Sequence, residues 1–323
     1  MKTPSFWKSK NIISILLYPI SLLYHLGYKV RCAINYKKYK SETPVICVGN
    51  LVMGGAGKTP TAIFISKFLK KMNKTYCFLS KGYTGNITKP TRVDLNSHTS
   101  KDVGDEPLLL AEYGDVYISK NRVEGLKYIN SLVGKYDYII MDDGLQNPTF
   151  IKDYSVIVVN GKFGFGNNML FPSGPLRDKL KNMKGKVNRV IVIDRDEYGI
   201  TKLCKKYKLK CSYLETKFNI QKIMLERKFI AFSGIANTDK FFNSLDECLI
   251  DTVERITFPD HHNFHNTDIE ILMDMTDNWN YGLITTKKDW VRLKKKHRDD
   301  ILYLDMSLRL AKKKRENKDG EIY

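Results

Sequence analysis

Residues 48–61 read V-G-N-L-V-M-G-G-A-G-K-T-P-T, and this stretch decides the fold. It follows the apolar run Val45–Val48, which predicts a β-strand, and it leads into a segment with helical periodicity from Lys58 to about Met72. Backbone N–H groups at such a strand-to-helix turn, together with the helix dipole, favour a bound phosphate. We therefore predict a phosphate-binding loop made of Gly54, Gly55, Ala56, Gly57, Lys58, Thr59 and Pro60.

The loop departs from the usual pattern G-x-x-x-x-G-K-[ST], because Val52 stands where that pattern has its first glycine. The chemistry of the G-K-T core is nevertheless complete. Lys58 can reach the β- and γ-phosphates of a nucleotide, and the Thr59 hydroxyl can bind Mg²⁺. ATP and Mg²⁺ are the expected cofactors.

A second predicted strand, Tyr138–Met141, ends in Asp142 and Asp143. Carboxylates at the carboxyl edge of a parallel sheet are how phosphate-loop enzymes present the acid that binds magnesium. We expect Thr59 with Asp142 or Asp143 to bind the metal, and the sequence does not choose between the two aspartates.

Predicted strands and helices alternate from Val45 to Ile193, which is typical of a doubly wound parallel α/β sheet. A second, smaller α/β unit opens at Phe229, and the extended segments Ser212–Ile220 and Ile301–Leu310 are candidates for the crossings between the two lobes. The expected domains are an N-terminal membrane-associated helix (1–40), a phosphate-loop core (41–215), and a second lobe with linker strands and a basic tail (216–323). The Gly/Asn/Pro-rich stretch 161–175 is expected to be a long active-site loop.

The chain carries 54 Lys and Arg against 35 Asp and Glu, a formal charge of +19, which favours anionic partners. From Ile12 to Tyr28 it is mostly apolar, yet this run is too short to span a bilayer and contains Pro19 and His25. Lysines flank it on both sides, so we expect a helix lying in the interface of an anionic leaflet; a helix packed on the protein's own core is the alternative. Six cysteines without a C-x-x-C pair indicate a reducing compartment and no structural zinc.

Several further motifs lie on loops or at strand ends: S-K-G-Y (80–83), G-D-E-P (104–107), S-x-x-R (119–122), D-D-G-L-Q (142–146), F-G (165–166), G-P-L-R (174–177), A-F-x-G-I (231–235), D-H (260–261) and T-x-K-D (286–289). Taken in order with the phosphate loop, they resemble the tetraacyldisaccharide 4′-kinase family, the lipid A 4′-kinases of Gram-negative bacteria. That family also lacks the first glycine of the loop.

The resemblance implies ATP-dependent phosphorylation of the 4′-hydroxyl of an acylated glucosamine disaccharide 1-phosphate. The product would be lipid IVA, formed at the cytoplasmic face of the inner membrane by a peripheral enzyme. It also implies that Asp105 is the catalytic base, paired with His261 of the other lobe, although His262 is an equally good candidate on chemistry alone. We expect a monomer.

The remaining site residues follow from the same motifs. Gln146 and Asp178 are expected near the metal, and Arg177 on the transferring phosphate, while Asn50, Lys81, Tyr83 and Arg122 are candidates for substrate contacts. Three residues depart from the family pattern: Asp178 replaces glutamate, Lys81 replaces arginine, and Lys287 replaces glutamate.

Two other functions compete with a lipid kinase. Thr286-Lys287-Lys288-Asp289 fits the T-K-x-D guanine-specificity pattern, which would indicate a membrane-associated GTPase switch. The positive charge alone would suit a nucleic-acid-dependent ATPase, but no basic stripe interleaved with aromatic residues supports nucleic-acid binding.

Overall fold

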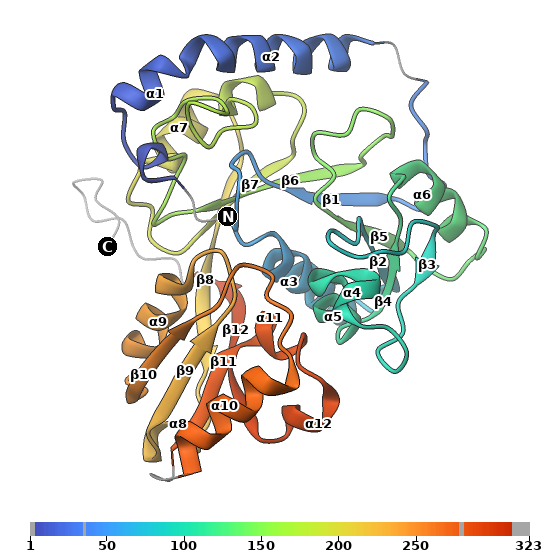
Figure 1. Ribbon diagram of the computed structural model, residues 1–323. Coiled ribbons are helices and arrows are strands. Elements are labelled where there is room, and N and C mark those ends of the chain that lie inside the picture. Colours follow the sequence, from blue (N-terminus) through green and yellow to red (C-terminus); the bar gives the residue numbers. More distant parts are fainter. Residues whose placement is uncertain (1–3, 35–36, 278–280, 312–323) are drawn as a thin grey trace.

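In this computed structural model, residues 4–34, 37–277 and 281–311 are described. The basic tail expected from Lys312 onwards lies outside them. Figure 1 shows three regions arranged end to end: the two N-terminal helices, the phosphate-loop lobe in the middle, and the second lobe at the other end.

One mixed sheet of 12 strands runs through the described part of the chain, in the order β10-β9-β11-β12-β8-β7-β6-β1-β5-β2-β4-β3. The first lobe contributes β1 (Val45–Gly49), β2 (Tyr76–Ser80), β3 (Thr91–Arg92), β4 (Asp115–Ile118), β5 (Tyr138–Asp142), β6 (Tyr154–Asn160) and β7 (Arg189–Ile193). All of these are parallel to their neighbours except β3, which pairs antiparallel with β4. The predicted doubly wound α/β sheet is confirmed.

The second lobe adds β9 (Phe229–Ser233), β10 (Thr252–Thr257) and β11 (Gly282–Thr286), and two long strands join the lobes. These are β8 (Cys211–Asn219) and β12 (Ile301–Leu310), which pair antiparallel from Asn219 and Asp305 to Leu214 and Leu310. They coincide with the two extended segments that the sequence marked as crossings between the lobes.

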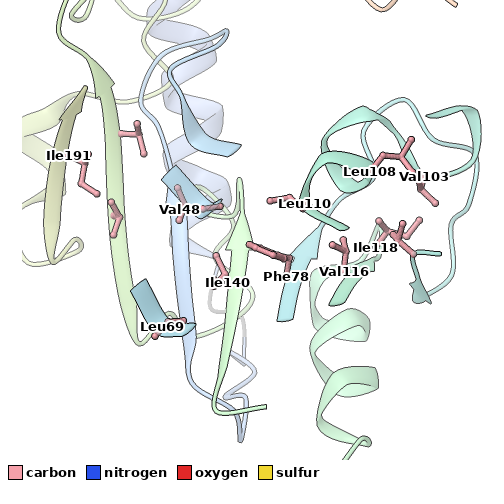
Figure 2. Packing of buried hydrophobic residues seen from close by; sticks show 14 of the residues in the cluster. Val48, Leu69, Phe78, Val103, Leu108, Leu110, Val116, Ile118, Ile140 and Ile191 are labelled. Carbon is pink, nitrogen blue, oxygen red and sulfur yellow. The ribbon is translucent and has the colours of Figure 1, made fainter. Parts of the chain in front are cut away.

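The helices of the first lobe are α3 (Lys58–Lys71), α4 (Ser100–Val103), α5 (Asp105–Ala111), α6 (Arg122–Asn130) and α7 (Ile200–Lys206), with the 3₁₀ turn η2 (Leu180–Met183). Those of the second lobe are α8 (Ile223–Glu226), α9 (Thr238–Glu247), α10 (Asn266–Asp277), α11 (Lys287–Trp290) and α12 (Lys295–Arg298). The strands of the first lobe carry apolar side chains on both faces, as a parallel sheet covered by helices requires. Figure 2 shows part of this core, where Val48, Phe78, Ile140 and Ile191 come from four different strands and Leu69 and Leu110 from the covering helices.

The N-terminal segment consists of a 3₁₀ turn η1 (Ser5–Trp7), α1 (Ile12–Leu16) and α2 (Tyr18–Ala33). Its orientation is inverted relative to an ordinary surface helix. Ser21 is completely buried and hydrogen-bonds Leu170 O at 2.9 Å and Ser173 Oγ at 2.7 Å, whereas Leu23 is 70% exposed. The helix therefore contacts the protein through Ser21 and presents apolar side chains such as Leu23 outwards. Figure 1 shows α1 and α2 lying along one end of the molecule. Within the described residues, no helix combines the length and apolarity needed to cross a bilayer.

The stretch 161–175 has a different position from the one expected of an active-site loop alone. Several of its contacts support the N-terminal segment: Trp7 donates to Pro172 O, and Asn167 donates to Phe6 O. Its end reaches the phosphate loop, where Met53 N donates to Pro175 O at 2.7 Å. The stretch thus connects the N-terminal helices to the phosphate loop.

Candidate active site

The phosphate loop lies between β1 and α3, as the sequence predicted. Gly54 and Gly57 have φ values of +105° and +92°, which favour glycine, and Gly57 forms the N-cap of α3. A Cβ on Gly57 would lie 2.5 Å from Cδ1 of Ile193, so the loop is also packed too closely there for a side chain. Pro60 fits the first turn of α3 because that turn needs no N–H donor from it.

Asp142 and Asp143 stand beside the first turn of α3. Thr59 donates its hydroxyl to Asp142 at 3.1 Å, while Lys58 lies 3.5 Å from Asp143 and Arg177 lies 3.2 Å from the same carboxylate. Burial opposes ionisation of Asp143, but the charges of Lys58 and Arg177 outweigh it and keep the pKa of Asp143 below its ordinary value. Lys58 and Arg177, the two cations expected to contact phosphate, are therefore both paired with Asp143.

Asp142 differs from its neighbour in burial and in charge balance. It is 4% exposed, its Oδ1 has no hydrogen-bond partner among the described residues, and burial, with a contribution from Asp143, raises its pKa to about 6. A buried, unpartnered carboxylate oxygen beside a threonine hydroxyl fits a hard cation, which supplies the missing partner. The residues present therefore fit Mg²⁺, which Asp142 and Thr59 would hold.

The geometry around Asp105 brings the two lobes together. Asp105 opens α5 and is nearly buried, and its Oδ2 lies 2.8 Å from Nδ1 of His261 and 2.6 Å from Nη2 of Arg292. Burial alone would raise the pKa of Asp105, but these hydrogen bonds and the positive charges of Arg292 and Lys288 hold it well below its usual range. His262 points elsewhere, to Asp268 at 2.9 Å, so His261 is the histidine that contacts Asp105.

Two of the residues expected at the site hold the backbone. Gln146 donates to Asn50 O at 2.7 Å, and Asn50 donates to Gly54 O at 3.3 Å, so both brace the phosphate loop. Arg122, expected to contact substrate, is instead buried and donates to the carbonyls of Asp142 and Asp143, both at 3.0 Å. Its guanidinium fixes the turn in which Asp143 has a φ of +55°.

Asp178 does not join the two aspartates of the predicted metal site. Its carboxylate accepts from Lys179 N at 2.7 Å and from Asn182 Nδ2 at 2.6 Å, and no three His, Cys, Asp or Glu side chains form a metal cluster anywhere in the described ranges. The two remaining candidates, Lys81 and Tyr83, are exposed, and the Tyr83 ring lies 6.3 Å from that of His261.

Two adjoining cavities of about 340 and 370 Å³ lie under α2 and share Tyr28, Asp178 and Lys186. His25 lines the first, and Gln146 lines the second. The space therefore runs from the outward-facing helix α2 to the residue that braces the phosphate loop. Its lysines, Lys29, Lys38, Lys152 and Lys186, make the lining basic.

Sequence reasoning missed Arg292, the cation closest to Asp105. The available signal was the spacing of Asp289 and Arg292, an oppositely charged (i, i+3) pair that can meet on one face of a helix. It also missed Lys288, which lies 2.7 Å from Glu106, the residue after Asp105.

The T-K-K-D segment does not have the arrangement of a guanine-binding site. Asp289 is completely buried and accepts from Ser233 Oγ at 2.9 Å, Thr286 Oγ1 at 2.7 Å and Arg292 Nη1 at 2.7 Å. Its carboxylate is therefore occupied inside the second lobe and has no free acceptor to offer a base. The alternative of a GTPase switch is not favoured.

Comparison with known proteins agrees with this geometry. The family model described as tetraacyldisaccharide-1-P 4′-kinase matches residues 13–319. The chain is 37% identical over 310 residues to a tetraacyldisaccharide 4′-kinase of Paramagnetospirillum magneticum, covering 95% of this chain and 94% of that protein. It is 36% identical to the protein of the same name from Rickettsia peacockii, covering 94% and 93%.

A solved structure shares the fold. The crystal structure of LpxK from Aquifex aeolicus in complex with ATP superimposes with a TM-score of 0.77 at 24% identity, covering 93% of this chain and 96% of that one. Together with the family model, which spans nearly the whole sequence, the relatives settle the assignment: this chain belongs to the tetraacyldisaccharide-1-P 4′-kinase family.

Proposed function

We propose that this protein transfers the γ-phosphoryl group of ATP to the 4′-hydroxyl of a tetraacylated disaccharide 1-phosphate. The observation that carries the proposal is the Asp105–His261 contact between two different lobes, in a chain that also has a phosphate loop before α3 and whose curated relatives are 4′-kinases. In this reaction a new bond forms between the acceptor oxygen and the γ-phosphorus, and the bond from that phosphorus to the β–γ bridging oxygen breaks. ADP leaves, and the hydroxyl proton passes to Asp105.

Each residue of the phosphate loop has a physical role in this scheme. The backbone N–H groups from Gly54 to Thr59 and the N-terminus of α3 favour the phosphates, and Lys58 supplies a positive charge that Asp143 now holds. Mg²⁺, when bound by Asp142 and Thr59, neutralises charge on the phosphates. Arg177, also on Asp143, is placed to contact the transferring group.

Asp105 serves mainly to orient the acceptor. A carboxylate with a depressed pKa is a weak base, and phosphoryl transfer depends chiefly on positioning and charge stabilisation. Because His261 comes from the second lobe, the Asp105–His261 contact exists only when the lobes are together. Lobe closure therefore sets the geometry of the acceptor hydroxyl.

The acceptor enters from a lipid surface in this proposal. The exposed apolar face of α1 and α2 fits the acyl boundary of a leaflet, and the basic cavities beneath α2 lead towards Gln146 and the phosphate loop. Anionic headgroups and the 1-phosphate of the acceptor both match the positive charge of this side. The protein would thus work on a lipid without having to cross the bilayer.

The test incubates purified protein with γ-labelled ATP, Mg²⁺ and detergent-dispersed disaccharide 1-phosphate lipid. Label should appear in a bisphosphorylated lipid, and Asp105→Ala should reduce the rate by about 10²-fold or more. Asp137→Ala, which removes an exposed aspartate near the opposite edge of the sheet, should leave the rate unchanged. Label released only as free phosphate, or transfer that prefers GTP, would contradict the proposal.

A further inference from the structure

A buried row of polar side chains crosses from the second lobe to Asp105. Arg292 donates from Nη2 to Asp105 at 2.6 Å and from Nη1 to Asp289 at 2.7 Å, and the side chains of Arg292 and Asp105 are 2% and 4% exposed. Nη1 also donates to Gly234 O at 2.8 Å. One guanidinium therefore connects the end of β9 and the start of α11 to the first residue of α5.

The second-lobe end of this row is held by several hydrogen bonds. Asp289 lies at the start of α11, where Thr286 caps the helix and both Thr286 and Ser233 donate to its carboxylate. Arg292 is thus fixed in place by partners of its own lobe before it reaches Asp105. The planar fork of arginine makes this possible, since it presents parallel donors at a fixed spacing.

His261 and Arg292 share the same oxygen, Oδ2 of Asp105. The arginine occupies the buried side of that oxygen, while the His261 side chain is 28% exposed and so lies towards the open site. We propose that Arg292 is a positioning residue, which holds Asp105 in one orientation and in its ionised form when the lobes are together. The T-K-K-D segment would then serve to anchor Arg292. This inference rests on the proposed function, because it assumes that Asp105 acts on the acceptor.

The charges around Asp105 determine how the loss of Arg292 would change its titration. Besides Arg292, the cation Lys288 lies 4.0 Å from the Asp105 carboxylate. Three further carboxylates pair with the groups around Asp105. Asp289 contacts Arg292, Glu106 contacts Lys288, and Asp260 lies 3.8 Å from His261. Burial opposes ionisation of Asp105, and Arg292 is one of the groups that offset it. Without Arg292, burial is less well compensated, so the pKa of Asp105 rises and ionisation needs a higher pH.

The experiment measures kcat against pH for wild type, Arg292→Lys and Arg292→Gln in the labelled-lipid assay. Arg292→Gln should lower kcat about tenfold or more and move the acid limb of the profile up by about one pH unit or more. Arg292→Lys keeps a charge but cannot reach Asp105, Asp289 and Gly234 together. Its kcat and the position of its acid limb should therefore fall between those of wild type and Arg292→Gln. KM for ATP should change little, because Arg292 does not contact the phosphate loop.

Lys287→Ala is the matched control. Lys287 also joins the lobes, through Glu112 at 2.7 Å, but does not contact Asp105, so its loss should leave the acid limb in place. A wild-type profile in Arg292→Gln, or the same shift in Lys287→Ala, would overturn the inference. Should Arg292→Gln fail to fold, a wild-type kcat and acid limb in Arg292→Lys would overturn it instead.

A carboxyl-carbon NMR titration of Asp105 separates this inference from the proposed function. It reports the expected upward shift in the arginine variants without any turnover. If the wild type fails to phosphorylate the lipid while Asp105 still titrates higher in the variants, the function is wrong and the electrostatic role of Arg292 stands. If the wild type is active and Asp105 titrates alike in all three proteins, Arg292 does not hold Asp105 in its ionised form.

Discussion

Asp142, the last residue of β5, and Asp143, which follows it, have opposite pKa shifts. Asp142 is buried without a cation in direct contact, whereas Asp143 is paired with Lys58 and Arg177. Asp142→Asn should therefore stabilise the metal-free protein at neutral pH. The pKa of Asp142 is raised to about 6 in the folded protein, so the folded protein holds this proton more tightly than the unfolded chain does. The free energy of unfolding therefore falls by up to roughly 3 kcal/mol as the pH rises from about 4 through about 6.

Urea unfolding with EDTA at pH 4.5 and 7.5 measures this difference. The asparagine variant should gain stability relative to wild type only at the higher pH, while activity is lost. Asp143→Asn is the matched control and should destabilise, because the pKa of Asp143 is depressed by its cations. A variant that gains nothing at pH 7.5 would show that the buried charge costs less than the structure implies.

Gly57 is a second residue whose identity is required by its backbone conformation and its close packing. Gly57→Ala places a Cβ at a φ of +92° and 2.5 Å from Ile193 Cδ1, so it combines backbone strain with a clash. We expect a loss of about 2–4 kcal/mol in the free energy of unfolding, and loss of ATP binding. Gly134→Ala has a φ of +71° in open space and should cost only about 1–2 kcal/mol, which isolates the clash. Equal losses in the two variants would contradict this account.

At the scale of the element, different residues of α2 are expected to determine protein stability and vesicle binding. Leu23→Lys combined with Leu26→Lys changes two exposed side chains, so thermal unfolding should stay within about 0.5 kcal/mol of wild type. Flotation with vesicles that contain anionic lipid should nevertheless fall sharply, because we propose that the apolar face enters the leaflet.

Ser21→Ala provides the opposite case on the same helix. It removes the buried hydrogen bonds to Leu170 and Ser173 and should cost about 1–2 kcal/mol of stability, while vesicle binding remains. If the double leucine variant and Ser21→Ala change stability and vesicle binding in the same way, the two faces of α2 do not have these separate roles.

At the scale of the whole molecule, ion pairs on α11 hold the second lobe against α5. Lys287 contacts Glu112 at 2.7 Å, and the two side chains are 18% and 29% exposed. Lys287→Glu places like charges together and should lower the free energy of unfolding by about 1–2 kcal/mol. Adding Glu112→Lys restores opposite charges and should recover at least half of the loss. A double-mutant cycle with no coupling energy would show that this pair does not help hold the lobes.

The sequence by itself determined the features that depend on short stretches of chain. The strand–turn–helix of the phosphate loop, the two aspartates after Met141 and the alternation of strands and helices were all predicted correctly. Each depends on local backbone preferences and on the period of buried side chains, which a few consecutive residues specify.

Only the tertiary structure decided which distant side chains meet. Asp105 lies 156 residues from His261 and 187 from Arg292, and Asp178, placed near the metal by sequence, turned towards Asn182 under α2. Such contacts depend on how β8 and β12 set one lobe against the other, and no local pattern encodes that packing. The inward serine face of α2 has the same origin, because the apolar residues alone do not say whether they cover a core or face outwards.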